Sequence, residues 1–190
     1  MKVGSTLLTA LVVAMAAVLL ASCAANDRCA QLPGSGRYCL VSTAGPTFRA
    51  EQLVTIRFQG KTSNLIARIN SDEQGLRFAG LTPFGQTLIQ LSWDHDQLRA
   101  ELPTGFDGRL GAALFPALLQ LATWPVERAR EGLLVGLVLL DRPGGRVVND
   151  GHQDLLIISW EGDVLPYRRL RFDVPSMGLH IDARTLEELQ

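Results

Sequence analysis

Apolar and polar residues alternate along the middle of this chain, from Glu51 to Leu102. Val54, Ile56 and Phe58 alternate with polar neighbours, and the same period of two recurs in three later runs. These runs are Leu65–Ile69, Leu76–Phe78 and Thr87–Trp93. A period of two over consecutive runs is typical of antiparallel strands with one buried face. Turn residues such as Gln59-Gly60-Lys61 and Thr82-Pro83-Phe84-Gly85 separate the runs, so the pattern predicts a strand meander.

The apolar period becomes helical after this meander. The expected N-cap is Asp107, and Pro116 is expected to kink or split the helix. The opposite face of the helix is also apolar, through Ala112, Phe115 and Leu119, so the helix is predicted to be buried on both sides or to cover a cavity. The apolar stripe consists of Leu110, Ala113, Leu114, Ala117, Leu118 and Leu121.

A second helix is predicted over Val126–Leu140, with Pro125 at its first helical position. The segment is ambiguous because Leu133–Leu140 also fits a buried strand, but the polar first turns favour the helix. Strands are predicted to return at Arg146–Asn149, Asp154–Trp160, Tyr167–Val174 and Gly178–Ala183. We therefore expect an α+β fold, in which a curved antiparallel sheet is lidded by apolar helices. Such a fold encloses either an apolar cavity or a filled core, and the pattern fits both equally well.

The N-terminal segment has the features of an export signal. It combines Lys2 with an apolar run from Leu7 to Leu20 that is shorter than a typical membrane span. The following Ala21-Ser22-Cys23 resembles the lipobox of bacterial lipoproteins. That resemblance implies removal of residues 1–22 and a diacylglycerol on the Cys23 thiol. An ordinary secretory signal, or a membrane anchor with a chance cysteine, is the alternative.

Lipidation at Cys23 would make residues 23–28 a tether and residues 29–190 the folded domain. Aspartate after the lipidated cysteine commonly retains bacterial lipoproteins in the inner membrane, so Ala24 indicates the outer membrane, with the domain facing the periplasm. Cys29 and Cys39 remain as an even pair in an oxidising compartment, which predicts a disulfide bond, with two free thiols as the alternative.

Composition and motifs favour no catalytic or nucleic-acid function. The formal net charge is −1, so there is no basic field for nucleic acid. His95, between Asp94 and Asp96, has the residue types of an acid–base or metal cluster, but a solvated hairpin turn is favoured. His152 and His180 have no partner in the sequence. We expect no catalytic residue, metal or cofactor.

Three arginines near the C-terminus allow two interpretations. Arg168, Arg169 and Arg171 either contact anionic lipid headgroups or simply face solvent beside the buried Leu170 and Phe172, and the second interpretation is favoured.

Several segments resemble the outer-membrane lipoprotein receptor LolB and, more distantly, its periplasmic partner LolA. They are the loop and strand Leu81–Trp93, the Trp124-Pro125 break, and the hairpin from Ile158 to Phe172. More closely still, the chain resembles the DUF3261 type, small uncharacterised lipoproteins found among LolB-like proteins, some beside aryl polyene biosynthesis genes. The chain departs from the LolB pattern in two ways: it has the cysteine pair near its start, and its C-terminal region is shorter and acidic.

The LolB resemblance implies an unclosed β-barrel that binds lipoprotein acyl chains and transfers them to the outer membrane. Leu110, Leu114, Leu118 and Leu121 would line the cavity. Pro83-Phe84-Gly85 would be the membrane-insertion loop, with Phe84 at its tip; the alternative is that Phe84 folds back onto the core. The implied partners are membrane lipid, acyl chains of lipoproteins or of a pathway lipid, and a LolA-like carrier. The alternative functions are a non-catalytic envelope assembly accessory with a filled core, serving an aryl polyene-type pathway, and an enzyme that acts on lipid-linked substrates.

Overall fold

A computed structural model describes residues 28–34, 36–42, 44–94, 96–102 and 111–187. The signal segment, Cys23, Asp107 and Leu110 lie outside the described residues, as does His95. No helix in the described part of the chain is long and apolar enough to cross a membrane.

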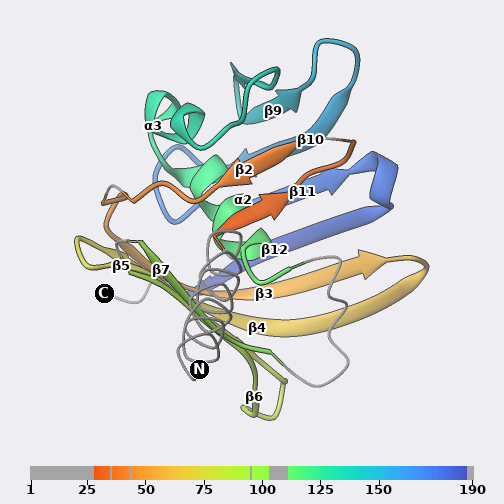
Figure 1. The fold of residues 1–190 in the computed structure, drawn as a ribbon. Helices are drawn as coiled ribbons and strands as arrows, with labels where there is room; N and C mark the ends of the chain where they lie inside the picture. Colours follow the sequence, from red (N-terminus) through yellow and green to blue (C-terminus); the bar gives the residue numbers. More distant parts are fainter. Residues whose placement is uncertain (1–27, 35, 43, 95, 103–110, 188–190) are drawn as a thin grey trace, which may run out of the picture.

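Ten antiparallel strands form one curved sheet, and its edge strands β7 and β8 do not pair with each other (Figure 1). The fold is thus the predicted α+β unclosed barrel. In spatial order the strands are β7 (Gln97–Glu101), β6 (Thr87–Asp94), β5 (Gly75–Leu81), β4 (Lys61–Asp72), β3 (Phe48–Phe58), β12 (Leu179–Glu187), β11 (Arg169–Val174), β10 (Asp154–Glu161), β9 (Gly145–Asn149) and β8 (Val138–Arg142).

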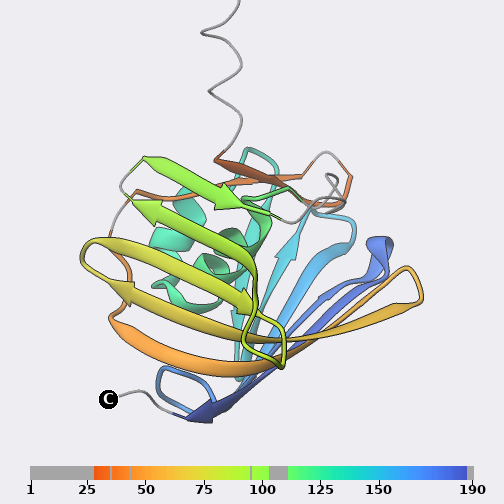
Figure 2. The same ribbon diagram turned by 90° about the horizontal axis from the view of Figure 1, so that it is seen from below.

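The alternation in the sequence places the apolar set of each strand on the concave face, as predicted for the meander. On β4, for example, Leu65, Ala67 and Ile69 are buried while Asn64 and Arg68 are exposed. Figure 2 shows the sheet curving around α2 (Leu114–Thr123), every residue of which is buried. The core therefore lies between this helix and the inner face of the sheet.

The helical predictions need two corrections. Pro116 does not kink or split α2, because the helix begins only at Leu114 and its first-turn N–H groups need no intrahelical acceptor. The second helix, α3, covers only Val126–Glu131, and Pro125 precedes it as the N-cap. The prediction of a helix up to Leu140 is wrong: residues 132–137 form a loop and Val138–Arg142 form β8.

Gly132 explains why α3 ends there. A Cβ on this glycine would lie 2.5 Å from the Cys39 carbonyl oxygen, so only glycine permits the close approach of the N-terminal strand. That strand, β2 (Arg37–Cys39), pairs with β1 (Cys29–Gln31) in a small hairpin. The Cys39 N–H donates to the Gly132 carbonyl at 2.8 Å. A long-range contact with the N-terminal hairpin therefore ends the helix here, although the local sequence favours its continuation.

Candidate functional site

An apolar cavity of about 30 Å³ lies between α2 and the inner face of the sheet. Strands β3, β4, β5, β11 and β12 contribute its wall, and α2 contributes Phe115, Leu118 and Leu119. Phe78 of β5 stacks on Phe115, with ring centroids 5.6 Å apart. The one polar lining residue, Gln52, donates from its amide to the Thr185 hydroxyl at 3.1 Å. The space therefore offers a ligand almost no hydrogen-bonding group.

Of the predicted cavity-lining residues that the structure describes, one lines this cavity and two do not. Leu118 lines this cavity, whereas Leu114 and Leu121 are buried in the core and are not among its lining residues. Leu110 lies outside the described residues. Phe115 and Leu119 were assigned to the opposite helix face, and they reach the cavity because the sheet curves around the helix.

The second half of α2 is fixed by a buried polar group that the sequence reasoning missed. Gln120 is fully buried, and its Oε1 accepts from the Val41 N–H at 2.9 Å and from the Tyr38 hydroxyl at 3.1 Å. Its Nε2 donates to the Val41 carbonyl at 3.0 Å, and that carbonyl also accepts from the Trp93 indole at 3.0 Å. Burial raises the pKa of Tyr38, so its hydroxyl remains a neutral donor. The sequence carries one sign of this buried group, because Gln120 is the polar residue in the otherwise apolar run from Leu114 to Ala122.

Arg146 of β9 fixes the end of the same helix. Its Nη1 donates to the carbonyls of Leu121 and Trp124, at 2.8 and 2.7 Å. Its Nε donates to the Asp141 carboxylate at 3.0 Å, and the guanidinium lies 5.7 Å from the ring centroid of Trp160. A cation at a helix C-terminus satisfies carbonyls that have no partner within the helix. The cavity therefore borders Phe115 and Leu118 in the first half of α2 and Leu119 at the start of the second half, which is anchored.

The β5–β6 turn carries the predicted membrane-insertion loop. Phe84 at its tip is 93 % exposed, and Pro83 and Gly85 beside it are also exposed. The Gly85 N–H donates to the Thr82 carbonyl at 2.9 Å, and Gly85 has a φ of +82°, a conformation that favours glycine. The turn thus holds a large apolar ring in solvent and not against the core.

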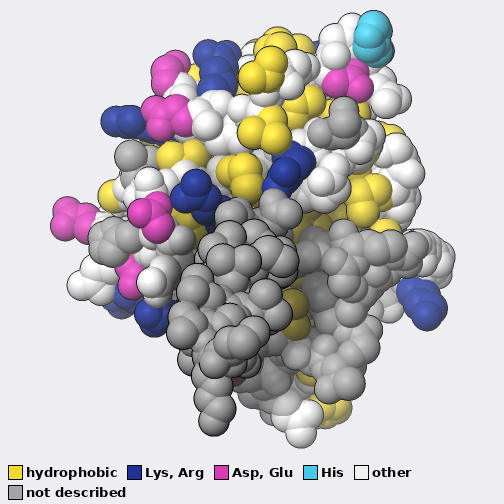
Figure 3. All heavy atoms as spheres, viewed as in Figure 1, with side chains coloured by type: hydrophobic (Ala, Val, Ile, Leu, Met, Phe, Trp, Pro, Cys, Tyr) yellow, Lys and Arg dark blue, Asp and Glu magenta, His cyan; other side chains and the backbone are white. Residues whose placement is uncertain are grey.

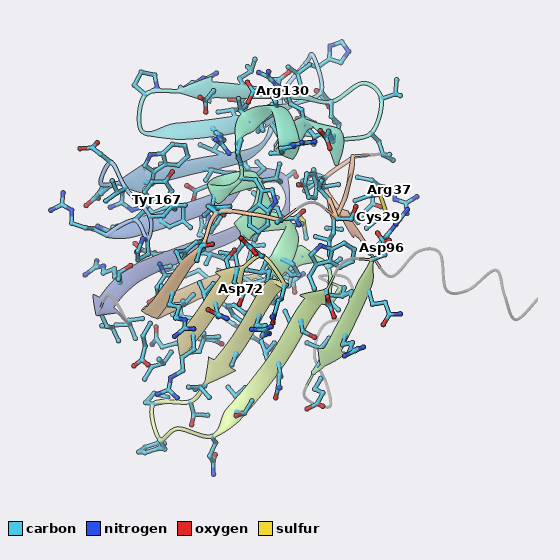
Figure 4. The ribbon with its side chains drawn as sticks, turned by 90° about the vertical axis from the view of Figure 1, so that its left-hand side faces the viewer. Cys29, Arg37, Asp72, Asp96, Arg130 and Tyr167 are labelled. Atoms are coloured by element: carbon cyan, nitrogen blue, oxygen red, sulfur yellow. A yellow bond between two sulfur atoms is a disulfide. The ribbon has the colours of Figure 1, made fainter. Side chains whose placement is uncertain are left out.

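The N-terminal hairpin marks where the tether would meet the folded domain. Cys29 and Cys39 form the predicted disulfide bond. The Arg28 guanidinium lies 3.8 Å from the Asp96 carboxylate, in the turn that follows β6. Figure 4 shows Cys29, Arg37 and Asp96 together at one side of the molecule. Since Phe84 precedes β6 and Asp96 follows it, the hairpin and the Phe84 tip lie at opposite ends of that strand.

Among the remaining candidates, three side chains are paired on the surface. Arg169 forms an ion pair with Asp182, which raises the pKa of Arg169 and lowers that of Asp182. Arg171 pairs with Glu161 at 3.0 Å, and His180 contacts Asp173 on the neighbouring strand. Within the described residues, no group of three or more His, Cys, Asp or Glu side chains is arranged to hold a metal ion.

Comparison with known proteins identifies one family. A family model described as a protein of unknown function (DUF3261) matches residues 49–186. No curated protein matches the chain.

Proposed function

The chain belongs to the DUF3261 family, and we propose that it is an outer-membrane lipoprotein that takes up acyl chains of lipids or lipoproteins and passes them to the membrane. The observation that carries this proposal is the apolar cavity under α2. An acyl chain has no polar group to satisfy along its length, and a wall with a single polar residue matches it. The lipobox at Cys23 and the likeness to LolB and LolA support the same function.

The cavity is small. An apolar cavity of roughly 150 Å³ is large enough to bind benzene. At about 30 Å³, the space under α2 is too small for an acyl chain unless the helix and the sheet separate. Ligand uptake in this proposal therefore includes an opening movement.

The contacts of α2 suggest which part moves. Gln120 and Arg146 anchor its second half to Val41 and β9. The first half presents Phe115 and Leu118 to the cavity, and Gly111, with a φ of +61°, lies just before it. We place the movement in this first half, where separation of Phe115 from Phe78 enlarges the space between α2 and the sheet.

In this proposal, the Phe84 side chain enters the acceptor membrane when the cargo is delivered. A side chain of this size, 93 % exposed on a tight turn, is stabilised by entering a membrane or a partner. A LolA-like periplasmic carrier is the proposed donor of the cargo, and the outer membrane is the acceptor.

Narrowing the cavity tests the proposal. Ala183 lines the cavity from β12, and Ala183→Val in a soluble form beginning at Ala24 adds two methyl groups to that wall. We expect binding of a fluorescent fatty-acyl probe to weaken by about tenfold, which corresponds to about 1.4 kcal/mol. Ala79→Val is the matched control, because Ala79 faces the outer side of the sheet beside the inward Phe78. Equal binding by both variants, or none by the unaltered protein, would contradict the proposal.

The small volume of the cavity favours a second candidate function. A core this nearly filled is what a non-catalytic envelope assembly accessory would have, serving an aryl polyene-type lipid pathway without carrying lipid itself. Such a protein would bind no acyl probe, whereas its Cys23 would still be lipidated.

A further inference from the structure

The loop between α3 and β8, together with β8 itself, exposes a group of aliphatic side chains that lies outside the proposed cavity and the Phe84 turn. Leu134, Val135, Val138 and Leu140 are exposed large hydrophobic residues within a short stretch of chain, and Val135 is fully exposed. We call these four residues the α3–β8 patch. Figure 3 shows hydrophobic side chains over the upper part of the molecule, in the region where α3 and β9 are labelled in Figure 1. Clustered apolar side chains on a surface mark a contact with a membrane or a partner.

Backbone hydrogen bonds fix the patch to the N-terminal hairpin. The Leu134 N–H donates to the Arg37 carbonyl at 3.2 Å, and Tyr38 forms a β-bridge with Leu133. The Leu137 N–H donates to the Leu134 carbonyl at 3.2 Å, which closes the loop on itself. The patch and the hairpin therefore form one unit.

The hairpin begins immediately after the tether. Arg28 is the fifth residue after Cys23, and five residue steps span at most about 18 Å when the chain is fully extended. If Cys23 is held in a bilayer by its acyl chains, Arg28 at the start of the hairpin stays within that distance of the lipid surface. The α3–β8 patch is then among the apolar surfaces closest to the membrane.

We propose that the α3–β8 patch inserts into the interfacial region of the bilayer that holds the lipid anchor, as a second membrane contact that orients the domain. The inference rests on the lipidation included in the proposed function, but not on the cavity or on cargo. Apolar area buried in the membrane interface strengthens membrane binding, so this contact would add to the lipid anchor and favour one orientation of the domain. Phe84 lies at the far end of β6 from the hairpin, so contact of the patch with the bilayer and insertion of Phe84 belong to two different orientations of the tethered domain.

Strand addition from another chain is a poorer explanation for the patch. An edge strand recruits a partner strand through unpaired backbone groups. On β8, the Leu139 carbonyl already accepts from Nε and Nη2 of Arg130, at 3.3 and 3.1 Å. Arg130, labelled in Figure 4, thus covers part of the edge where a new strand would pair.

Site-specific fluorescence tests the membrane contact. With Cys23 acylated and Cys29 bonded to Cys39, one introduced cysteine is the single labelling site. The full-length lipidated protein carrying Val135→Cys is labelled with an environment-sensitive fluorophore and reconstituted into vesicles of phosphatidylethanolamine and phosphatidylglycerol. Val164→Cys is the matched control, since Val164 is an exposed valine in the β10–β11 loop that does not belong to the patch.

We expect the label at position 135 to be quenched several-fold by nitroxide-bearing lipids and to shift to shorter emission wavelengths, while the label at 164 does neither. A label at 135 that stays as accessible to aqueous quenchers as the label at 164 would overturn the inference. Protection at 135 without quenching by lipid nitroxides, together with cross-linking between two copies, would also overturn it and would indicate a copy-to-copy interface. Mass spectrometry of the reconstituted protein for acylated Cys23 reports separately on the anchor, and probe binding reports on the cavity.

Discussion

The side-chain amide of Gln120 forms two hydrogen bonds with the backbone of Val41, accepting from its N–H at 2.9 Å and donating to its carbonyl at 3.0 Å. A buried glutamine thus pairs the middle of α2 with the segment that leads from the N-terminal hairpin into the sheet. The pairing explains how one helix stays on the concave face of a sheet that does not close.

Replacing Gln120 with leucine should destabilise the fold. The Val41 N–H and the Tyr38 hydroxyl would both lose their buried acceptor, and each such loss costs about 1–3 kcal/mol. We expect the free energy of unfolding in urea to fall by about 2–6 kcal/mol. The exposed Gln153→Leu is the control and should change stability by about 0.5 kcal/mol or less. Equal stability of the two variants would show that the Val41 pairing is dispensable.

Arg146→Met should weaken the end of α2. The substitution keeps a long apolar side chain but removes the donor to the carbonyls of Leu121 and Trp124. A loss of about 2–3 kcal/mol in unfolding free energy is expected. Arg142→Met, at an exposed site on the same β8–β9 hairpin, should have little effect. Hydrogen exchange of α2 amides provides the local measurement, and unchanged protection there would rule out this role for Arg146.

Phe84→Glu should leave the fold intact and impair delivery. Because the side chain is 93 % exposed, we expect a stability change of about 0.5 kcal/mol or less. Transfer of a fluorescent lipid from the protein to vesicles should slow at least tenfold, while binding of that lipid is unchanged. Gln86→Glu places the same charge in the same turn and is the control. Unaltered transfer by Phe84→Glu would mean that delivery does not use this turn.

Cys23→Ser should abolish lipidation. The lipobox predicts that the thiol of this residue receives the diacylglycerol, and serine has no thiol. Metabolic labelling with a fatty-acid analogue should mark the unaltered protein and leave the variant unmarked. The Cys29→Ala/Cys39→Ala double variant, which removes the other thiols, should remain labelled. Labelling of Cys23→Ser would place the acyl group elsewhere.

Sequence periodicity was sufficient to predict the sheet but not the contacts that hold the helices. The alternation around Val54, Leu65, Phe78 and Leu91 reports which face of each strand is buried, because successive strand residues point to opposite sides. The resemblance to LolB supplied the unclosed barrel. Phe84 was correctly expected to be exposed, because a turn apex between two regular strands has few neighbours to cover it.

The errors arose where long-range contacts decide the local structure. Leu133–Leu140 is apolar at both helical and strand spacing, and the helix ends because Gly132 lets the hairpin backbone approach. Strands β1 and β2 have only three residues each, too few for a periodic signal. The roles of Gln120 and Arg146 depend on partners 79 and 25 residues away in the sequence, which no local pattern reveals.

Photo-crosslinking in cells tests the central claim, that this protein carries acyl chains under α2, most directly. Cells producing the full-length chain are grown with a photoactivatable fatty acid and irradiated, and adducts are mapped by mass spectrometry of peptides. If acyl chains bind under α2, adducts are expected on the peptide that contains Phe115, Leu118 and Leu119, in addition to the acyl groups on Cys23. Adducts confined to Cys23 and to exposed residues such as Val135 would contradict this claim, and would leave the accessory with a filled core as the better description.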